Sequence, residues 1–465
     1  MTPLYFHLQF GEINMVTQTS HVATRPLYRY RRAVNSPYLC PFLLTWALSV
    51  VEMTSINPVI IILSIRTRHS IASGEPVMKV IPQIQNNHTE LTAWRRDIHA
   101  HPELGFEEER TAKLVADRLE GFGYQVERAV GGTGVVGTLR NGQSSRAIGL
   151  RADMDALPIH ESNEFDHRSR VDGKMHACGH DGHTTMLLGA AKYLAETRNF
   201  DGCIHLVFQP AEEGLGGAKA MVDDGLFERY PMDSIYGMHN KPGMDVGRFS
   251  IRPGPMMAGG GFFDIKLIGR GAHAARPESS ADPIVAASQI VSALQSVVSR
   301  NVDPQDTAVL SVTRLLSGEA YNVIPNDATV GGTIRAFLPA TLDLMEKRIG
   351  EIAMGIAQSL GVTADYNFRL IFLPLINDED ATRIAGDVAA SIVSEDNLNR
   401  RGPGIMASED FSYMLNECKG AYINIGNGGE EGHCEVHNPG YDFNDQILPL
   451  GATFFARLAE TQLPK

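Results

Sequence analysis

The sequence predicts an α/β protein in which a mostly parallel central sheet is interrupted by an inserted domain with the element order βαββαβ. Three observations favour this fold. The chain has 465 residues, which is too long for a single hydrophobic core. Its 43% hydrophobic and 20% charged residues are typical of a globular protein and exclude a wholly disordered one. Strand-like and helix-like segments alternate along most of its length, which is the pattern of a parallel sheet.

The net charge and the cysteines argue against nucleic-acid binding and against an oxidising compartment. With 41 Lys and Arg against 54 Asp and Glu, the chain carries a formal charge of −13, which repels phosphate backbones. We therefore expect no general nucleic-acid binding. Five cysteines, an odd number scattered over a long chain, do not make a disulfide framework and favour a reducing compartment such as the cytoplasm.

The first 77 residues differ from the rest in charge. They hold six arginines, no lysine and three acidic residues, a net charge of +3, which leaves −16 for the remaining 388 residues. The apolar run at 40–51 follows a basic stretch, as in a signal peptide or a membrane anchor. Pro41, Glu52 and the long leader before the run argue against both. We expect residues 1–77 to be a disordered extension, or to precede the native start, and we expect no membrane association.

The central sheet is expected from short apolar strands that begin after residue 78. Two amphipathic helices within 88–124, interrupted at Pro102, come before all of them, and a third helix is expected at 184–199. The expected strands are 134–140, 146–153, 203–209, 234–239 and 420–426.

Four of these strands end in residues that can bind a metal or carry a proton. They are Asp153 and Asp155, Glu212 and Glu213, His239 and Asn240, and, beyond a Gly-rich loop, His433 and His437. In open parallel sheets, ligands bind beyond the carboxyl ends of the strands. The sequence therefore predicts a site at this edge of the sheet.

The inserted domain is expected at 259–373, between two parts of the main domain at 78–258 and 374–465. Its strands are expected at 262–269, 307–315, 328–337 and 363–372, and its helices at 282–300 and 342–360. This order is the split-βαβ, or ferredoxin-like, arrangement.

The segment HACGHDGH, from His176 to His183, indicates a divalent metal site. A thiolate and an imidazole two residues apart, Cys178 and His180, are suitable ligands. The alternatives are a buried cysteine beside a hydrogen-bonded histidine, or a structural zinc knuckle, but none of the other cysteines forms the paired spacing that a knuckle needs.

The adjacent Glu212 and Glu213 suggest a division of roles. On extended backbone, successive side chains point in different directions, so one carboxylate can bind a metal while the other faces the substrate. The candidate ligands are Cys178, His180, Glu213, His239 and His437. Five ligands exceed the needs of one open catalytic metal and suggest two divalent ions with a bridging ligand.

From Met78 onward the chain resembles the aminoacylase and glutamate carboxypeptidase superfamily of two-metal hydrolases. Within it, the chain is most similar to the amidohydrolase branch that contains hippurate hydrolase and the auxin–amino acid conjugate hydrolases. The matching motifs are RRDIHAHPELGFEE, GLRADMDALPI, HACGHDGH, QPAEEG, GMHN, GRGAHAARPE, NVIPN, GGTIRAF, ASEDF and HNPGYDFND. The resemblance implies a two-metal exopeptidase-like catalytic domain with an inserted ferredoxin-like lid, and a homodimer formed through that lid.

The resemblance also implies roles for individual residues. Cys178 takes the bridging position, Glu212 is the general base, and Asp153 orients a ligand. On the lid, His273 stabilises the oxyanion, and Asn322 and Arg335 hold the carboxylate of the substrate.

These observations together predict hydrolysis of the amide bond of an N-acyl amino acid, such as hippurate, to a carboxylic acid and a free amino acid. The metals are expected to be Zn²⁺ or Mn²⁺. A dipeptidase or a deacetylase would use the same metals with a different pocket lining. A non-catalytic protein that binds acyl amino acids is the alternative from another class, but Glu212 and the full ligand set argue against it. The sequence does not identify the acyl group.

Overall fold

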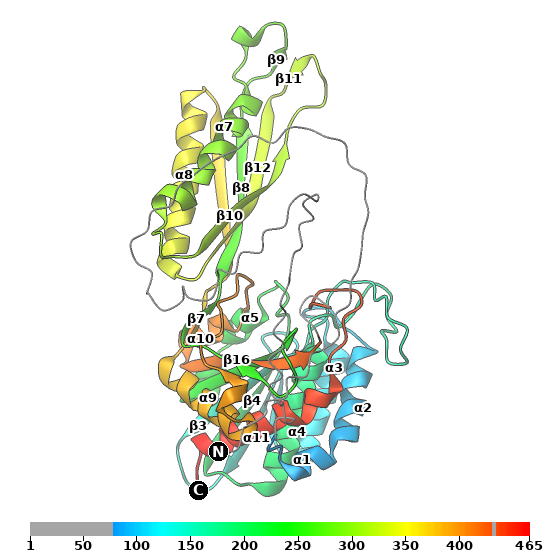
Figure 1. Cartoon of the computed structure of the whole chain (residues 1–465). Helices are drawn as coiled ribbons and strands as arrows, with labels where there is room; N and C mark the ends of the chain where they lie inside the picture. Colours follow the sequence, from blue (N-terminus) through cyan, green and yellow to red (C-terminus); the bar gives the residue numbers. More distant parts are fainter. Residues whose placement is uncertain (1–77, 430–433) are drawn as a thin grey trace, which may run out of the picture. The chain divides into compact units, whose positions relative to one another are not determined.

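The computed structural model describes residues 78–429 and 434–465. The expectations for residues 1–77, and the position of His433, lie outside these ranges. The described chain contains an eight-stranded sheet and a four-stranded sheet, each with its own hydrophobic cluster (Figure 1). The α/β fold with an inserted ferredoxin-like domain is confirmed.

The large sheet has the strand order β1-β2-β4-β3-β5-β16-β6-β15. In that order its strands are β1 (Gln125–Val130), β2 (Gly134–Asn141), β4 (Gly202–Gln209), β3 (Ala147–Asp153), β5 (Ser234–Pro242), β16 (Gly420–Gly428), β6 (Phe249–Ser250) and β15 (Leu398–Asn399). The four central strands, β4, β3, β5 and β16, are parallel. The expected strand at 134–140 forms β2, but it runs antiparallel to β4. The edge strand β1 was not predicted, because most of its residues are exposed and no apolar run marks it.

Helices cover both faces of this sheet. They are α1 (Pro82–Asn86), α2 (His88–His99), α3 (Glu109–Phe122), α4 (His180–Thr197), α5 (Gly217–Asp223), α6 (Leu226–Arg229), α9 (Glu379–Val393), α10 (Ser412–Glu417) and α11 (Leu448–Gln462). As expected, Pro102 separates α2 from α3. Gly123 ends α3 in a left-handed conformation, with φ of 89°, which glycine adopts without strain.

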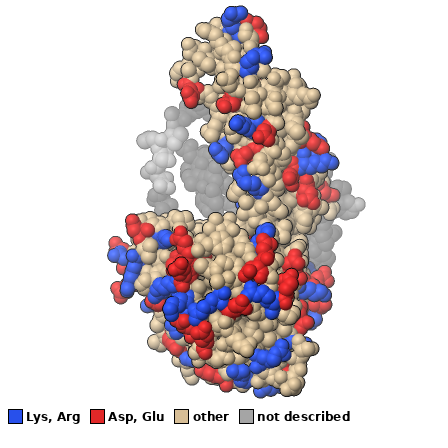
Figure 2. Space-filling model, turned by 180° about the vertical axis from the view of Figure 1, so that it is seen from behind, with Lys and Arg blue, Asp and Glu red and all other residues tan. Residues whose placement is uncertain are grey.

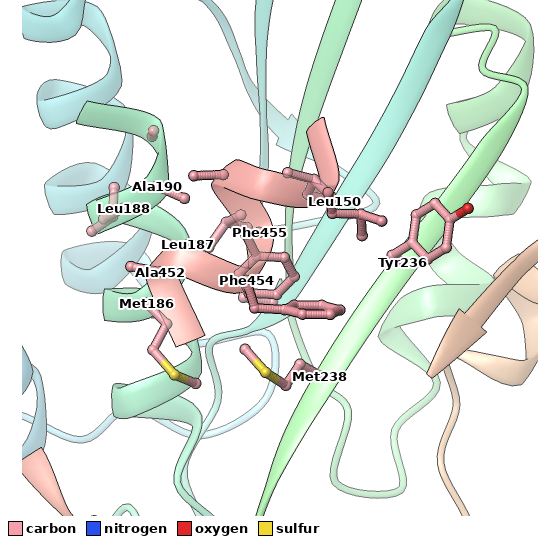
Figure 3. Packing of buried hydrophobic residues seen from close by; sticks show 14 of the residues in the cluster. Leu150, Met186, Leu187, Leu188, Ala190, Tyr236, Met238, Ala452, Phe454 and Phe455 are labelled. Carbon is pink, nitrogen blue, oxygen red and sulfur yellow. The ribbon is translucent and has the colours of Figure 1, made fainter. Parts of the chain in front are cut away.

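The main core lies between the parallel strands and helices α4 and α11 (Figure 3). Met186 and Leu187 of α4 face Phe454 of α11, and Met238 of β5 approaches the same cluster. A Cβ at Gly451 would lie 2.0 Å from the Met186 sulfur, so a larger residue at this position would require the Met186 side chain to shift. The first fourteen or so residues of α4 are almost all buried, which fits a helix packed on several sides rather than on one face.

The inserted domain, called the lid below, has the antiparallel strand order β10-β12-β8-β13. Its strands are β8 (Gly259–Ile268), β10 (Ala308–Leu316), β12 (Asp327–Ala336) and β13 (Thr363–Phe372), with a small ribbon of β9 (Ala272–His273) and β11 (Val323–Ile324). Helices α7 (Pro283–Ser296) and α8 (Pro339–Ser359) pack on one face of this sheet (Figure 1). Two short strands, β7 (Gly254–Met257) and β14 (Leu375–Asn377), pair where the chain enters and leaves the lid.

Within residues 78–429 and 434–465, every helix is too short or too polar to cross a bilayer. Figure 2 shows basic and acidic side chains intermingled on the face in view, with no large area of a single sign. An even mixture of this kind offers no extended basic surface to a nucleic acid on that face.

Candidate metal centre and active site

The candidate site lies at the carboxyl edge of the four parallel strands. Because these strands are neighbours in one sheet, the loops that follow them meet at the same edge. The segment 176–179 reaches this edge just before α4 begins. Gly179 has a φ of 99°, and a Cβ there would lie 2.2 Å from the side-chain oxygen of Asn240. Glycine therefore allows this loop to pass close to the end of β5.

The five predicted metal ligands come together in overlapping groups. Cys178, His180 and His239 offer ligand atoms within 4.8 Å of one another, and Cys178, Glu213 and His437 form a second such group. The Sγ atom of Cys178 lies 3.3 Å from His239 Nε2, and His437 Nε2 lies 3.3 Å from Glu213 Oε1. His180 Nε2 lies 3.8 Å from the same oxygen of Glu213. Cys178 belongs to both groups, and His180 and Glu213 lie together with Glu212 in a third.

The donor atoms of this cluster fit a metal centre. His180 Nε2 and Glu213 Oε1 are buried and have no hydrogen-bond partner among the described residues. An unpaired buried polar atom normally costs about 1–3 kcal/mol, so such atoms are rare without a ligand. Burial and the nearby charges of Glu213 and Glu212 raise the pKa of Cys178 well above its ordinary value, so the thiol needs a cation to ionise. A sulfur, imidazoles and a carboxylate form a donor set typical of zinc and similar divalent ions.

Asp155, rather than Asp153, is hydrogen-bonded to a predicted ligand. His180 Nδ1 donates to Asp155 Oδ1 at 3.1 Å, which turns Nε2 toward the cluster. The other oxygen of Asp155 accepts the backbone N–H of Glu213 at 2.9 Å. Asp153 lies 2.7 Å from His183 Nδ1 and only approaches His180 Nε2, at 3.9 Å. The sequence pointed to the correct strand end but gave Asp155 no role, because both acids stand in the same motif.

Glu212 and Glu213 lie in a turn after β4, and Ala211 before them has a left-handed φ of 51°. The expectation that extended backbone turns the two carboxylates apart is therefore wrong. Glu212 Oε2 lies 4.0 Å and Glu213 Oε1 lies 3.8 Å from His180 Nε2, so both side chains reach the cluster. Adjacency alone does not separate a base from a ligand here.

A buried charged network lies behind Glu212. Arg151, which is fully buried, contacts Asp153 Oδ2 at 2.8 Å and Glu409 Oε1 at 2.9 Å. The backbone N–H of Asp410 donates to Glu212 Oε1 at 3.4 Å. Burial, and then the charge of Glu409, raise the pKa of Glu212 well above its ordinary value. A carboxylate with a raised pKa is a stronger base than an ordinary carboxylate.

Sequence reasoning did not assign Arg151, Glu409 or Asp410. Arg151 carried a usable signal, because a charged residue inside an apolar strand of a parallel sheet needs a buried partner. Its partners come from the ASEDF motif, 258 residues later in the chain. Only the fold brings the two together.

Two residues of the N-terminal motif RRDIHAHPELGFEE contact the segments that carry Glu212 and His180. Glu108 Oε1 accepts the backbone N–H of Ala211 at 2.8 Å and so holds the turn that carries Glu212. His99 is fully buried, and its Nδ1 lies 2.8 Å from Asp181, the residue after His180. These contacts are with neighbours of the cluster rather than with the cluster itself.

The three residues predicted on the lid do not meet within one chain. His273 pairs with Val323 in the β9–β11 ribbon, and Asn322 accepts a backbone hydrogen bond from Ala274, so His273 and Asn322 are neighbours. Arg335 stands near the other end of β12, where it pairs with Gly260 of β8. At about 3.3 Å per residue, the strand separates Arg335 from the ribbon by roughly 25 Å. His273 and Asn322 are exposed, and Arg335 is half-buried.

Comparison with known proteins gives one consistent match. Residues 149–461 match the model of peptidase family M20/M25/M40. A hippurate hydrolase from Campylobacter jejuni is 46% identical over 82% of this chain and 99% of its own length. IAA-amino acid hydrolase ILR1-like 4 of Arabidopsis thaliana is 42% identical over 79% of this chain and 84% of its own. The N-acetylcysteine deacetylase of Bacillus subtilis is 37% identical over 80% of this chain and 96% of its own.

Solved structures agree with this match. A dinuclear metal-binding peptidase of the M20 family from Bacillus subtilis is 33% identical, with a TM-score of 0.72. The alignment covers 82% of this chain and 99% of that structure. It therefore extends over the large sheet and the lid alike.

Proposed function

The chain belongs to peptidase family M20/M25/M40, and from this membership we propose that it is a metal-dependent hydrolase of N-acyl amino acids. It cleaves the amide bond and releases a carboxylic acid and a free amino acid. The observation that carries this substrate class is the 46% identity to a hippurate hydrolase, which extends over 99% of that relative. Hippurate is itself an N-acyl amino acid, with a benzoyl group on glycine.

A second candidate is removal of an acetyl group, or cleavage of a dipeptide, at the same site. The 37% identity to an N-acetylcysteine deacetylase favours the former. The two activities need the same metals and differ in the lining of the acyl pocket. Hydrolysis of the larger acyl group is preferred here because the identity to the hippurate hydrolase is higher over a similar length.

We assign two divalent metal ions to the cluster, with Cys178 as the shared ligand. The other ligands in this proposal are His180, Glu213, His239 and His437. The unpaired buried atoms His180 Nε2 and Glu213 Oε1 support it, as does the dinuclear character of the Bacillus subtilis relative. A thiolate with imidazoles suits Zn²⁺, and Mn²⁺ is the alternative. Such ions supply Lewis-acid chemistry, polarising the amide carbonyl and lowering the pKa of the attacking water.

Glu212 serves as the general base in this proposal. Its carboxylate takes a proton from the attacking water and passes it to the leaving nitrogen, which then departs as an amine. Two features support the role: the backbone N–H of Asp410 positions one carboxylate oxygen, and the other lies 4.0 Å from His180 Nε2. Burial of Glu212 also excludes competing water from the carboxylate.

The lid residues complete the site in a homodimer. We propose that His273 donates to the oxyanion and that Asn322 and Arg335 bind the carboxylate of the amino acid. The separation of roughly 25 Å along β12 supports a site built from two chains, because one chain cannot bring Asn322 and Arg335 to one small substrate. One protomer then contributes Arg335, and its partner contributes His273 and Asn322.

We also propose a cytoplasmic location, which the odd number and scattered positions of the five cysteines support. Residues 1–77 are relevant to this proposal, because their apolar run at 40–51 follows a basic stretch, as in a signal peptide or a membrane anchor. A fluorescent fusion at the C-terminus of the full chain would test it, and a membrane-bound or secreted signal would contradict it.

A hydrolysis panel tests the proposed reaction. The metal-loaded full chain is assayed with N-benzoyl-, N-indoleacetyl- and N-acetyl-amino acids and with dipeptides, each with Zn²⁺ or Mn²⁺. We expect the highest kcat/KM with an aromatic acyl group. A preference for acetyl substrates or dipeptides would select the second candidate, and the absence of amide hydrolysis with every substrate and metal would contradict the proposal.

A further inference from the structure

A cavity of about 650 Å³ opens at the opposite end of the large sheet from the metal cluster. Its floor is the beginning of β4, about 20 Å along the strand from Glu212 by the usual rise per residue. Register places Cys203 beside Arg140 of β2 and His205 beside Thr138. These four side chains share one face of the sheet, because alternate residues of a strand point the same way. The neighbouring Val207 continues that face as part of an apolar cluster, so the cavity begins where apolar packing ends.

The floor of the cavity is polar and well ordered. His205 and Cys203 are 6% and 2% exposed, with the sulfur 3.6 Å from His205 Nε2. Thr138 Oγ1 lies 2.9 Å from His205 Nδ1. Burial, and then the charge of Arg140, lower the pKa of His205 to about 4, so the imidazole is neutral at physiological pH. The histidine contributes hydrogen bonding to the floor and no charge.

The positive charge of the cavity comes from arginines around its opening. Arg229 is already paired with Glu127 and with Asp224, at 3.2 Å for the latter. Arg140 and Arg198 have no carboxylate within 4.0 Å among the described residues. Of the described residues that line the cavity, Asp233 alone is acidic, and its Oδ2 accepts the backbone N–H of Ala147.

The two unpaired guanidinium groups are held in place without being saturated. Arg198 donates to the carbonyls of Ala195 and Arg140, at 3.0 and 3.3 Å, and Arg140 donates to the carbonyl of Ser144 at 3.2 Å. A guanidinium has five N–H donors, so within residues 78–429 and 434–465 each retains donors without a protein acceptor. Two arginines without a counter-charge from the described part of the chain are unexpected in a protein with a net charge of −13.

We propose that this cavity is a binding site for a small phosphate-bearing metabolite, distinct from the metal centre. Paired guanidinium forks match the geometry and the double charge of a phosphate monoester, whereas a carboxylate carries one charge and needs one fork. A volume of about 650 Å³ is in the range of metabolite sites and exceeds that of a free phosphate ion. The Thr138 hydroxyl, held by His205 Nδ1 at 2.9 Å, provides a neutral hydrogen-bonding group for the remainder of the ligand.

The test uses calorimetric titration of the metal-loaded full chain with phenyl phosphate, and with benzoate as a carboxylate of similar shape. We expect saturable binding of phenyl phosphate that weakens about tenfold or more in the double variant Arg140→Gln/Arg198→Gln. The matched control is Arg146→Gln, since Arg146 is exposed in the β2–β3 connection but does not line the cavity, and it should bind like the wild type. The variant Arg140→Lys/Arg198→Lys retains the charges and should recover part of the affinity.

Three results would overturn the proposal. They are no saturable binding of phenyl phosphate, equal binding by the wild type and the glutamine double variant, and a loss of benzoate affinity in that variant as large as the loss of phenyl phosphate affinity. Binding lost on removal of the metals but retained in the glutamine variant would likewise assign the ligand to the metal centre. Unfolding temperatures measured without ligand identify a variant that has failed to fold, and the lysine variant then decides.

Discussion

The metal cluster and the lid differ in how their predicted site residues are held. At the carboxyl edge of the large sheet, ligand-type atoms from four segments lie within a few ångströms of one another, and two of these residues, Cys178 and His180, are buried. On the lid, His273 and Asn322 are exposed on a small ribbon, and Arg335 stands near the other end of β12. The cluster is assembled within one chain, whereas the lid residues are not.

This difference shows which groups of predicted site residues a single chain can bring together. Parallel strands bring their carboxyl ends to one edge, so residues after different strands meet without a partner. An antiparallel ferredoxin-like sheet instead distributes its residues along the full length of each strand. The three predicted lid residues are therefore too far apart within one lid to meet at one small substrate, and we expect the two regions to respond differently to mutation.

The largest effect is expected inside the cluster, from Glu212. Replacement of Glu212 by Gln keeps the size of the side chain and removes the base, so kcat should fall by about 10²–10⁴-fold. Metal content should stay near that of the wild type, because Glu212 holds no metal in the proposed assignment. Steady-state kinetics and metal analysis of the purified variant measure both quantities.

Glu213→Gln is the matched control at the adjacent position. It should lose metal, and part of its activity should return when excess metal is added. Because both carboxylates lie within 4.0 Å of His180 Nε2, the geometry alone leaves the roles exchangeable. Loss of metal from Glu212→Gln and its retention in Glu213→Gln would exchange them.

The next effect concerns the two aspartates after β3. Asp155 accepts from the His180 ring and from the backbone N–H of Glu213, so Asp155→Asn should weaken metal affinity by about 10–100-fold. Asp153→Asn is the comparison, and it should cost less, because Asp153 bonds to His183 and to Arg151. Competition with a chelator measures both affinities. A larger loss for Asp153→Asn would restore to Asp153 the role that the sequence suggested.

These aspartates also mark the limit of what the sequence could predict. The five proposed ligands could be predicted because each follows a recognisable strand or stands in the HACGHDGH motif, and the structure brings them together. The choice between Asp153 and Asp155 depends on which carboxylate faces the His180 ring, a matter of side-chain geometry in the folded loop. The buried pairing of Arg151 with Glu409 depends on contacts between segments 258 residues apart, which no local pattern encodes.

The lid also shows what the sequence could and could not predict. Its βαββαβ order was readable from apolar periodicity, and the strand order β10-β12-β8-β13 agrees with it. The separation of Asn322 from Arg335 was not readable, because it follows from the register of β12 on β8. The turn at Glu212 was also missed, since the left-handed backbone of Ala211 has no glycine to indicate it.

A moderate effect is expected when two inactive variants are combined. If the partner subunit's His273 completes each site, a mixture of Glu212→Gln and His273→Ala chains forms one intact site in each mixed dimer. After subunit exchange, activity should recover to at most about a quarter of the wild-type value. Mass spectrometry or a tag on one variant verifies that mixed dimers have formed. No recovery in verified mixed dimers would mean that His273 serves the site of its own chain.

The smallest effect is expected from removal of residues 1–77. The proposed ligands, base and lid residues all lie beyond Met78, and the sheets and cores of both regions are built from residues 78–465. A chain that begins at Met78 should therefore fold and hydrolyse the same substrates, with kcat/KM within about twofold of the full chain. Kinetics and thermal unfolding of the two chains, prepared in parallel, measure this. A large loss of activity with retained folding would show that the first 77 residues contribute to the site, and a loss of folding would show that they contribute to one of the two cores.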